Sequence, residues 1–229
     1  MKKIGLIGGM SWESTVTYYK IINQTVKERL GGFHSATLLL YSVDFAVIEE
    51  CQAKGDWDKS AEILADAAKS LEYAGADFIV ICTNTMHKVA PQIQNQIGIP
   101  IIHIADATAD ELIHAGIRTV GLLGTKYTMT QEFYKEKLIA KGISVVIPDE
   151  EDVEIVNRVI YEELCLGIIS DNSRKQYQRI IEEMKEKGAE GVILGCTEIG
   201  LLIQQEDSLL PVFDTTQIHA YVAAVKAIG

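Results

Sequence analysis

The chain has 229 residues, of which 48% are hydrophobic and 23% are charged, and its formal net charge is −11. This composition excludes a largely disordered chain, and the negative charge is opposite to that of a nucleic-acid groove, so we expect no nucleic-acid partner. No apolar run is long enough to span a membrane and no secretory signal stands near the start, which favours a cytoplasmic protein without a membrane partner.

Short apolar runs alternate with amphipathic helical segments along the chain. The strands expected in the first half are residues 4–7, 36–43, 77–82 and 101–104. A helical stripe of apolar residues follows the first strand and ends at Gly31-Gly32. The alternation resumes with a strand at 119–123 and continues to the C-terminus. Because parallel strands are joined by helical crossovers, this order predicts an α/β fold with mostly parallel sheets flanked by helices.

The second half of the chain repeats the first. Segment 4–8 (IGLIG) reappears as 120–124 (VGLLG), and segment 75–81 (GADFIVI) reappears as 188–194 (GAEGVIL). The repeat predicts two pseudo-symmetric α/β lobes. Their predicted bounds are residues 1–98 with 208–229 for the first lobe, and residues 99–207 for the second. Ligands of parallel sheets bind at the carboxyl ends of the strands, so we expect the active site in the cleft between the lobes.

Polar residues follow the third apolar run of each half. They are Thr83, Asn84 and Thr85 in the first half, and Cys196, Thr197 and Glu198 in the second. Hydroxyl groups, amides and the N-termini of the following helices suit the carboxylate and ammonium of a small molecule. A thiol near a helix N-terminus has a lowered pKa, so Cys196 is predicted to act as a base near neutral pH. The alternative is that Cys196 is a small buried hydrophobe.

The cysteines and glycines give no sign of a metal or cofactor. The four cysteines are Cys51, Cys82, Cys165 and Cys196. They lie far apart and form no C-x-x-C pair, so we predict no metal site and reduced thiols. The glycines before Met10 do not form the G-x-G-x-x-G fingerprint, so a dinucleotide is not expected. We therefore predict that the protein uses no cofactor.

Four motifs together resemble the aspartate/glutamate racemase superfamily along nearly the whole chain. The motifs are Gly5-Leu6-Ile7-Gly8-Gly9-Met10, Thr83-Asn84-Thr85-Met86-His87, Leu123-Gly124-Thr125 and Gly195-Cys196-Thr197-Glu198. The resemblance implies a homodimer that racemises an acidic amino acid without a cofactor, at a site between two lobes. It also implies two cysteines on opposite sides of the α-carbon, one of which removes the α-proton while the other returns a proton. Finally, it implies that the C-terminal helix belongs to the first lobe.

The first cysteine of this pair departs from the family pattern, which reads Cys-Asn-Thr-x-His. Here Thr83 stands directly before Asn84, and Cys82 is one place earlier. The internal repeat also places position 83 opposite Cys196, and successive strand residues point to opposite faces. We therefore predict that Thr83 and Cys196 are the catalytic residues and that Cys82 belongs to the core. The resemblance then favours an L-aspartate/glutamate-specific racemase, with Cys196 facing the α-hydrogen of the L-form.

The residues that hold the substrate's side-chain carboxylate also differ from the family. The family's Pro-Asp-Arg stretch is missing from residues 42–49, and Cys165 stands at the position of a substrate-contacting Lys. Lys126 is one replacement, and Gln52 is another unless it is an exposed surface residue. The full set of predicted substrate-binding residues is Met10 (through its backbone N–H), Gln52, Asn84, Thr85, Thr125, Thr197 and Glu198.

Other functions remain open on the sequence alone. A close alternative keeps the fold but changes the reaction, as in hydantoin racemases, maleate isomerases or arylmalonate decarboxylases. A two-lobed small-molecule binding protein without catalysis is the alternative from another class, because the second thiol is missing.

His87 is interpreted as a residue that caps or orients a helix.

Overall fold

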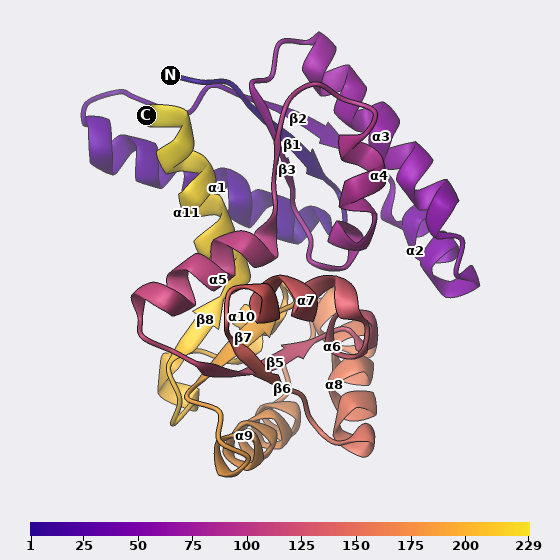
Figure 1. Ribbon diagram of the computed structural model, residues 1–229, viewed down its shortest axis with the longest axis vertical. Coiled ribbons are helices and arrows are strands. Elements are labelled where there is room, and N and C mark those ends of the chain that lie inside the picture. Colours follow the sequence, from indigo (N-terminus) through magenta and orange to yellow (C-terminus); the bar gives the residue numbers. More distant parts are fainter. The chain divides into compact units, whose positions relative to one another are not determined.

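The computed structural model describes residues 1–229, which form two compact units. The first unit comprises Met1–Ile104 and Thr216–Gly229, and the second comprises Ala105–Thr215. Each contains a four-stranded parallel sheet, with the order β2-β1-β3-β4 in the first and β6-β5-β7-β8 in the second. The two orders are equivalent, so the predicted α/β fold with two similar lobes is confirmed (Figure 1).

The first unit consists of four strands, five helices and one 3-10 turn. Its strands are β1 (Ile4–Gly8), β2 (Leu38–Ser42), β3 (Phe78–Ile81) and β4 (Ile101–Ile102). Its helices are α1 (Trp12–Leu30), α2 (Phe45–Lys54), α3 (Trp57–Tyr73), α4 (Ala90–Gln94) and most of α11 (Thr215–Ile228), with a 3-10 turn at Thr85–Val89.

The second unit has the same plan. Its strands are β5 (Thr119–Gly124), β6 (Ser144–Val146), β7 (Gly191–Gly195) and β8 (Val212–Asp214). Its helices are α5 (Ile104–His114), α6 (Lys126–Thr130), α7 (Glu132–Ala140), α8 (Glu150–Glu162), α9 (Asp171–Glu186) and α10 (Ile199–Leu202), with 3-10 turns at Leu164–Leu166 and Gln205–Asp207. Across all of these elements, no helix combines the length and hydropathy that a membrane span requires.

Side-chain alternation along β3 sorts the core of the first unit into two layers. Phe78 and Val80 pack with apolar residues of α1 and α11, whereas Ile79 and Ile81 pack with those of α3. Figure 1 shows α1 and α11 on one side of this sheet and α3 on the other. Because successive strand residues point to opposite faces, the sheet buries both faces, as a parallel sheet requires.

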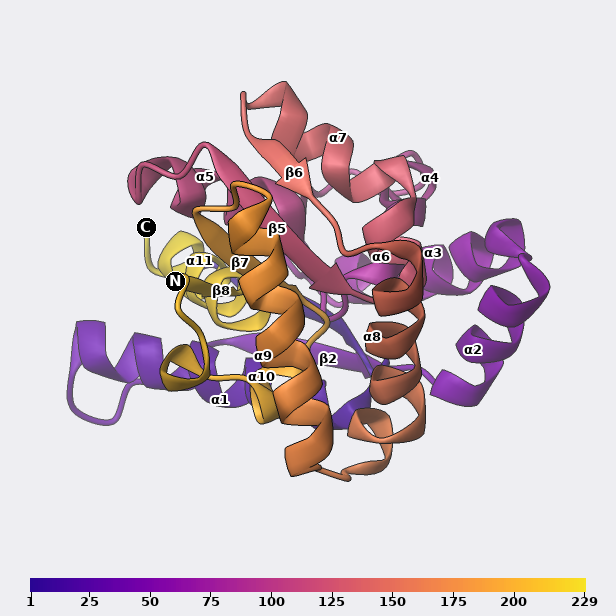
Figure 2. The same cartoon turned by 90° about the horizontal axis from the view of Figure 1, so that it is seen from below.

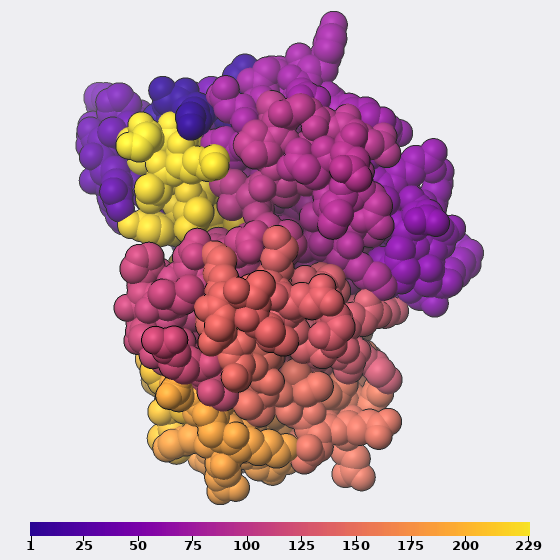
Figure 3. All heavy atoms as spheres, in the orientation of Figure 1, coloured from indigo at the N-terminus to yellow at the C-terminus, as the bar shows by residue number.

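The predicted unit boundaries are wrong by several residues at both chain crossings. The first unit extends past residue 98 because β4 pairs with β3, and the second extends past residue 207 because β8 pairs with β7. The chain then returns to the first unit in α11. The yellow C-terminal residues lie against the indigo N-terminal ones in Figure 3, and the Lys2 backbone N–H donates to the Ala227 carbonyl over 2.8 Å.

Two long helices cover one face of the second sheet. Apolar residues of α8 and α9, including Val156 and Ile180, pack with Val192 and Leu194 of β7. Figure 2 shows the two helices crossing this face next to one another. The resulting apolar cluster also contains Cys196, so the core of the second unit extends to the first residue after β7.

A buried histidine makes the first unit sensitive to acid. His219 on α11 contacts the Tyr18 hydroxyl through Nδ1 (2.8 Å) and the Ile102 carbonyl through Nε2 (2.9 Å). Burial, with a smaller contribution from His87, lowers the pKa of His219 to about 3. The unfolded chain therefore binds a proton near pH 6.5 that the folded chain does not bind.

The contacts of the neutral His219 ring stabilise the folded state. We predict that this stabilisation is complete above pH 6.5 and is lost as the pH falls towards the pKa of His219 in the folded chain. Between pH 6.5 and 4.5 the loss should be about 2 kcal/mol of unfolding free energy. Urea unfolding of the wild type and of His219→Gln at both pH values measures it, because Gln cannot titrate. Equal pH slopes for the two proteins would show that His219 does not cause the effect.

Candidate active site

The turn after β3 separates Cys82 from Thr83. The Cys82 side chain is fully buried in the apolar cluster with Phe78 and Val80, and burial raises the pKa of its thiol. Thr83 is partly exposed, and it follows Cys82 by one residue. This placement gives Cys82 the surroundings of a core residue and leaves Thr83 accessible.

Two side chains hold consecutive carbonyls of this turn. The Ser14 hydroxyl of α1 donates to the Cys82 carbonyl over 3.2 Å, and Nδ1 of His87 lies 2.8 Å from the Thr83 carbonyl. Asn84 and Thr85 are almost fully buried within the turn. No sequence motif points to Ser14, because only the folded chain brings α1 to this turn.

Met10 and Gln52 lie close to the first sheet's carboxyl edge. Met10 follows β1 and is buried; Gly9 before it has φ +89°, and a Cβ there would lie 2.2 Å from the Val43 carbonyl, so only glycine fits. Gln52 is also buried, and its Nε2 donates to the sulfur of Met86 over 3.0 Å. The alternative of an exposed surface glutamine is therefore wrong, because α2 packs Gln52 against the turn that carries Thr85.

In the second unit, Cys196 and Glu198 form a buried pair after β7. The Cys196 thiol donates to Oε2 of Glu198 over 3.1 Å, and the Thr197 hydroxyl donates to the same oxygen over 2.6 Å. Burial and the neighbouring Glu198 carboxylate raise the pKa of Cys196 well above its usual value. The lowered pKa predicted for this thiol is therefore wrong for the resting protein. The cost of burying a thiolate exceeds the effect of α10, which has only four residues.

Thr125 lies at the same edge of the second sheet as Cys196. Gly124 of β5 and Gly195 of β7 are paired in register, so the two residues each follow one member of that pair. Thr125 is the N-cap of α6, and its hydroxyl oxygen accepts from the Thr128 backbone N–H over 3.3 Å. The structure thus brings together Thr125, Cys196, Thr197 and Glu198 at one sheet edge.

The two other candidates near this edge have different surroundings. Lys126 is half exposed and forms an ion pair with Glu154 of α8, so its charge already has a partner. Cys165 is half buried against the apolar cluster that contains Cys196, and its thiolate would raise the pKa of Cys196. Nowhere in the structure do three His, Cys, Asp or Glu side chains gather in a way that could hold a metal ion.

Comparison with known proteins assigns these features to one family. The family model for Asp/Glu/hydantoin racemases matches residues 7–223, which include the turns after β3 and β7. The chain belongs to the Asp/Glu/hydantoin racemase family. It is an amino-acid racemase, and the predicted class of PLP-independent racemases is confirmed. The matched residues include parts of both units.

Two solved structures match the chain over their whole lengths, and one curated relative matches it over most of its length. An Asp/Glu racemase-type protein from Yersinia pestis is 58% identical, covers 100% of both chains and superposes with a TM-score of 0.94. An aspartate racemase homologue from Pyrococcus horikoshii is 41% identical over 100% of both chains, with a TM-score of 0.87. A broad specificity amino-acid racemase from Bacillus subtilis is 24% identical over 93% of this chain and 92% of its own.

Proposed function

We propose that this racemase acts on aspartate, glutamate or both, prefers the L-form, and uses Cys196 as its principal proton-transfer residue. The carrying observation is the buried contact of 3.1 Å between the Cys196 thiol and the Glu198 carboxylate at the carboxyl end of β7. A thiol with an adjacent base is the arrangement that general base catalysis needs. No cofactor takes part in this proposal, and the working form is a cytoplasmic homodimer.

The resting thiol must first lose its proton. In this proposal Glu198 accepts that proton, because its Oε2 already receives the Cys196 thiol hydrogen. An amino acid brings an ammonium group, and a nearby positive charge favours the thiolate. In this proposal the ammonium binds nearer to Cys196 than the substrate's two carboxylates do, so that its charge offsets part of the cost of the buried thiolate. The base forms when substrate is present, rather than in the empty site.

Racemisation then exchanges one C–H bond for another. The Cys196 thiolate takes the α-hydrogen of the L-form, and the carbanion receives a proton on its opposite face. Thr83 is the residue proposed for that face, where its hydroxyl gives a proton directly or holds a water that does. Exchange with solvent then returns a proton to the Thr83 side and removes the proton held by Glu198, which restores the resting site. A hydroxyl is a far weaker acid than a thiol, whose reference pKa is about 8.5, so protonation from the Thr83 side is the slow step.

Neutral donors hold the substrate in this proposal. Asn84 and Thr85 of the first unit are buried beside Thr83, while Thr125 and Thr197 lie beside Cys196. Hydroxyl and amide donors, with backbone N–H groups such as that of Met10, can bind carboxylates without a full positive charge. Gln52 contributes its amide next to the Thr85 turn. Aspartate and glutamate fit because each offers two carboxylates to these donors.

Chiral chromatography tests the substrate class. We expect purified protein to convert L-aspartate or L-glutamate slowly into the D-form, and to leave alanine, leucine and lysine unchanged. Conversion of the neutral or basic amino acids at equal rates would contradict the acidic substrate class, while leaving amino-acid racemisation itself in place.

Replacing Glu198 by glutamine should slow proton removal from the L-substrate by about 10²-fold at pH 7, because an amide cannot accept the thiol proton. The loss should shrink as the pH rises, since removing the carboxylate charge lowers the pKa of Cys196. Deuterium incorporation against pH measures both effects. Glu206→Gln, at an exposed glutamate, is the matched control. Wild-type exchange by Glu198→Gln at pH 7 would contradict the role of Glu198.

A further inference from the structure

His87 connects the Thr83 turn to the segment through which the chain leaves the first unit. Its Nδ1 lies 2.8 Å from the Thr83 carbonyl, and its Nε2 lies 3.2 Å from the Ile104 backbone nitrogen. Ile104 is the first residue of α5 and the last residue of the first unit before the chain crosses. The ring therefore connects Thr83 with Ile104, which lies 17 positions after His87 along the chain.

These two contacts select one form of the imidazole. A backbone N–H can only donate, so Nε2 of His87 must carry the lone pair that receives the Ile104 hydrogen. Nδ1 then carries the ring proton and donates it to the Thr83 carbonyl. The ring is almost fully buried, at 1% exposure, and a neutral ring with one fixed tautomer satisfies both partners.

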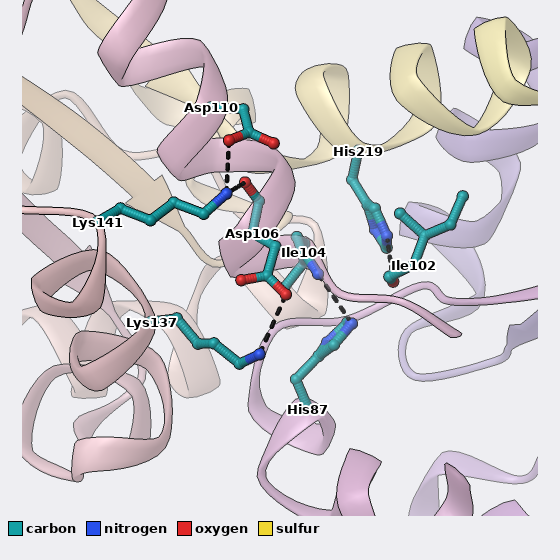
Figure 4. Close-up of polar contacts among 8 residues, drawn as sticks. All are labelled: His87, Ile102, Ile104, Asp106, Asp110, Lys137, Lys141 and His219. Carbon is teal, nitrogen blue, oxygen red and sulfur yellow. Dashed lines mark hydrogen bonds and ion pairs between the residues drawn. The ribbon is translucent and has the colours of Figure 1, made fainter. Parts of the chain in front are cut away.

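The segment at the other end of this connection is itself fixed. His219 contacts the Ile102 carbonyl two residues before Ile104 (Figure 4). In the second unit, α5 forms ion pairs with Lys137 of α7 and with Lys141 just after it: Lys137 pairs with Asp106 over 3.1 Å and Lys141 pairs with Asp110 over 2.5 Å. Within the first unit, His87 thus ties the turn that carries Thr83 to a segment that His219 also holds.

We propose that His87 is a positioning residue for Thr83, an inference that rests on the proposed function. Through its Nδ1–H the imidazole fixes the Thr83 carbonyl, and with it the direction in which the Thr83 residue faces. The ring itself takes no proton from the substrate. Its loss should therefore slow the step that needs Thr83 and spare the step that needs Cys196.

Two substitutions of His87 each keep one of its two hydrogen bonds, either the one to the Thr83 carbonyl or the one from the Ile104 N–H. The amide nitrogen of His87→Asn overlays Nδ1 and can still donate to Thr83, whereas the longer His87→Gln reaches the Ile104 N–H and loses the Thr83 contact. We expect His87→Gln to slow net inversion of L-aspartate or L-glutamate by about tenfold, since a well-placed hydrogen bond is worth about that factor in rate. His87→Asn should retain inversion within about threefold of the wild type, by the same reasoning.

The readout is the ratio of α-hydrogen exchange to inversion in D₂O. Exchange through Cys196 should stay near the wild-type rate in both His87 variants, so the ratio rises only in His87→Gln. His219→Gln is the control for a general disturbance of this segment, because it removes the contact to Ile102 and the ring contact to His87 while both His87 nitrogens keep their partners. In the wild type, nitrogen-15 NMR should report a neutral His87 with its proton on Nδ1, which does not depend on whether any variant folds.

The results distinguish a failure of the positioning role of His87 from a failure of the proposed function. Equal ratios in His87→Gln and His87→Asn, or an Nε2–H or charged His87 in the wild type, would overturn the positioning role alone. Absence of any exchange in the wild type would overturn the proposed function, and this inference with it.

Discussion

Cys196→Ala should lose about 10²–10⁴ in the rate at which the L-substrate exchanges its α-hydrogen, the usual cost of removing a general base. The loss follows because the Cys196 thiol, which donates to the Glu198 carboxylate, is the group that removes the α-hydrogen in the proposed mechanism. Substrate binding should largely survive, since the proposed donors are hydroxyl and amide groups on other residues. Proton NMR in D₂O measures exchange, and calorimetric titration measures binding.

Cys165→Ala is the matched control for this variant. Cys165 packs against the same apolar cluster, so its removal tests whether loss of any nearby thiol has the same effect. We expect Cys165→Ala to keep exchange. Wild-type exchange by Cys196→Ala would remove Cys196 from the mechanism.

Thr83→Cys should raise net interconversion in both directions by about tenfold or more, because a thiol transfers protons near neutral pH far better than a hydroxyl. The enantiomers have equal free energy in water, so kcat/KM must rise equally for the L- and D-forms. Polarimetry or chiral chromatography started from each enantiomer checks this equality. A variant that is faster in one direction only would point to an unmeasured side reaction.

Cys82 provides the control for the position of the second proton-transfer residue. Its thiol is fully buried among apolar residues, so Cys82→Ala should cost stability rather than activity. Thr83→Ala should slow net inversion. If Cys82→Ala abolishes activity and Thr83→Ala does not, Cys82 is the second proton-transfer residue.

The two sheets could be predicted from sequence because each strand is a short apolar run and the runs repeat in the same order. Alternation also predicted that Cys82 would face the core, and the structure places it there with Phe78 and Val80. The crossing points could not be predicted, since β4 has only two residues and α5 begins two residues later at Ile104.

The electrostatic state of the site depends on contacts that a sequence pattern does not contain. The motif Gly-Cys-Thr-Glu predicted a reactive thiol, but only the fold shows that the thiol is buried in the core beside Glu198. Burial then reverses the expected direction of the pKa shift of Cys196. The contact between Gln52 and Met86 joins α2 to a turn more than 30 residues away, so exposure of Gln52 could not be judged from its neighbours.

Wild-type protein in D₂O gives the most direct test of the central claim, that Cys196 ionises an acidic L-amino acid while Thr83 limits its inversion. For L-aspartate and L-glutamate in turn, proton NMR measures the loss of the α-hydrogen while chiral chromatography of the same reaction measures the D-form. If the thiol proton exchanges with solvent, we predict that the L-substrate loses its α-hydrogen faster than the D-form appears. Retention of the α-hydrogen by every amino acid tested, or D-product that appears as fast as the α-hydrogen is lost, would contradict it.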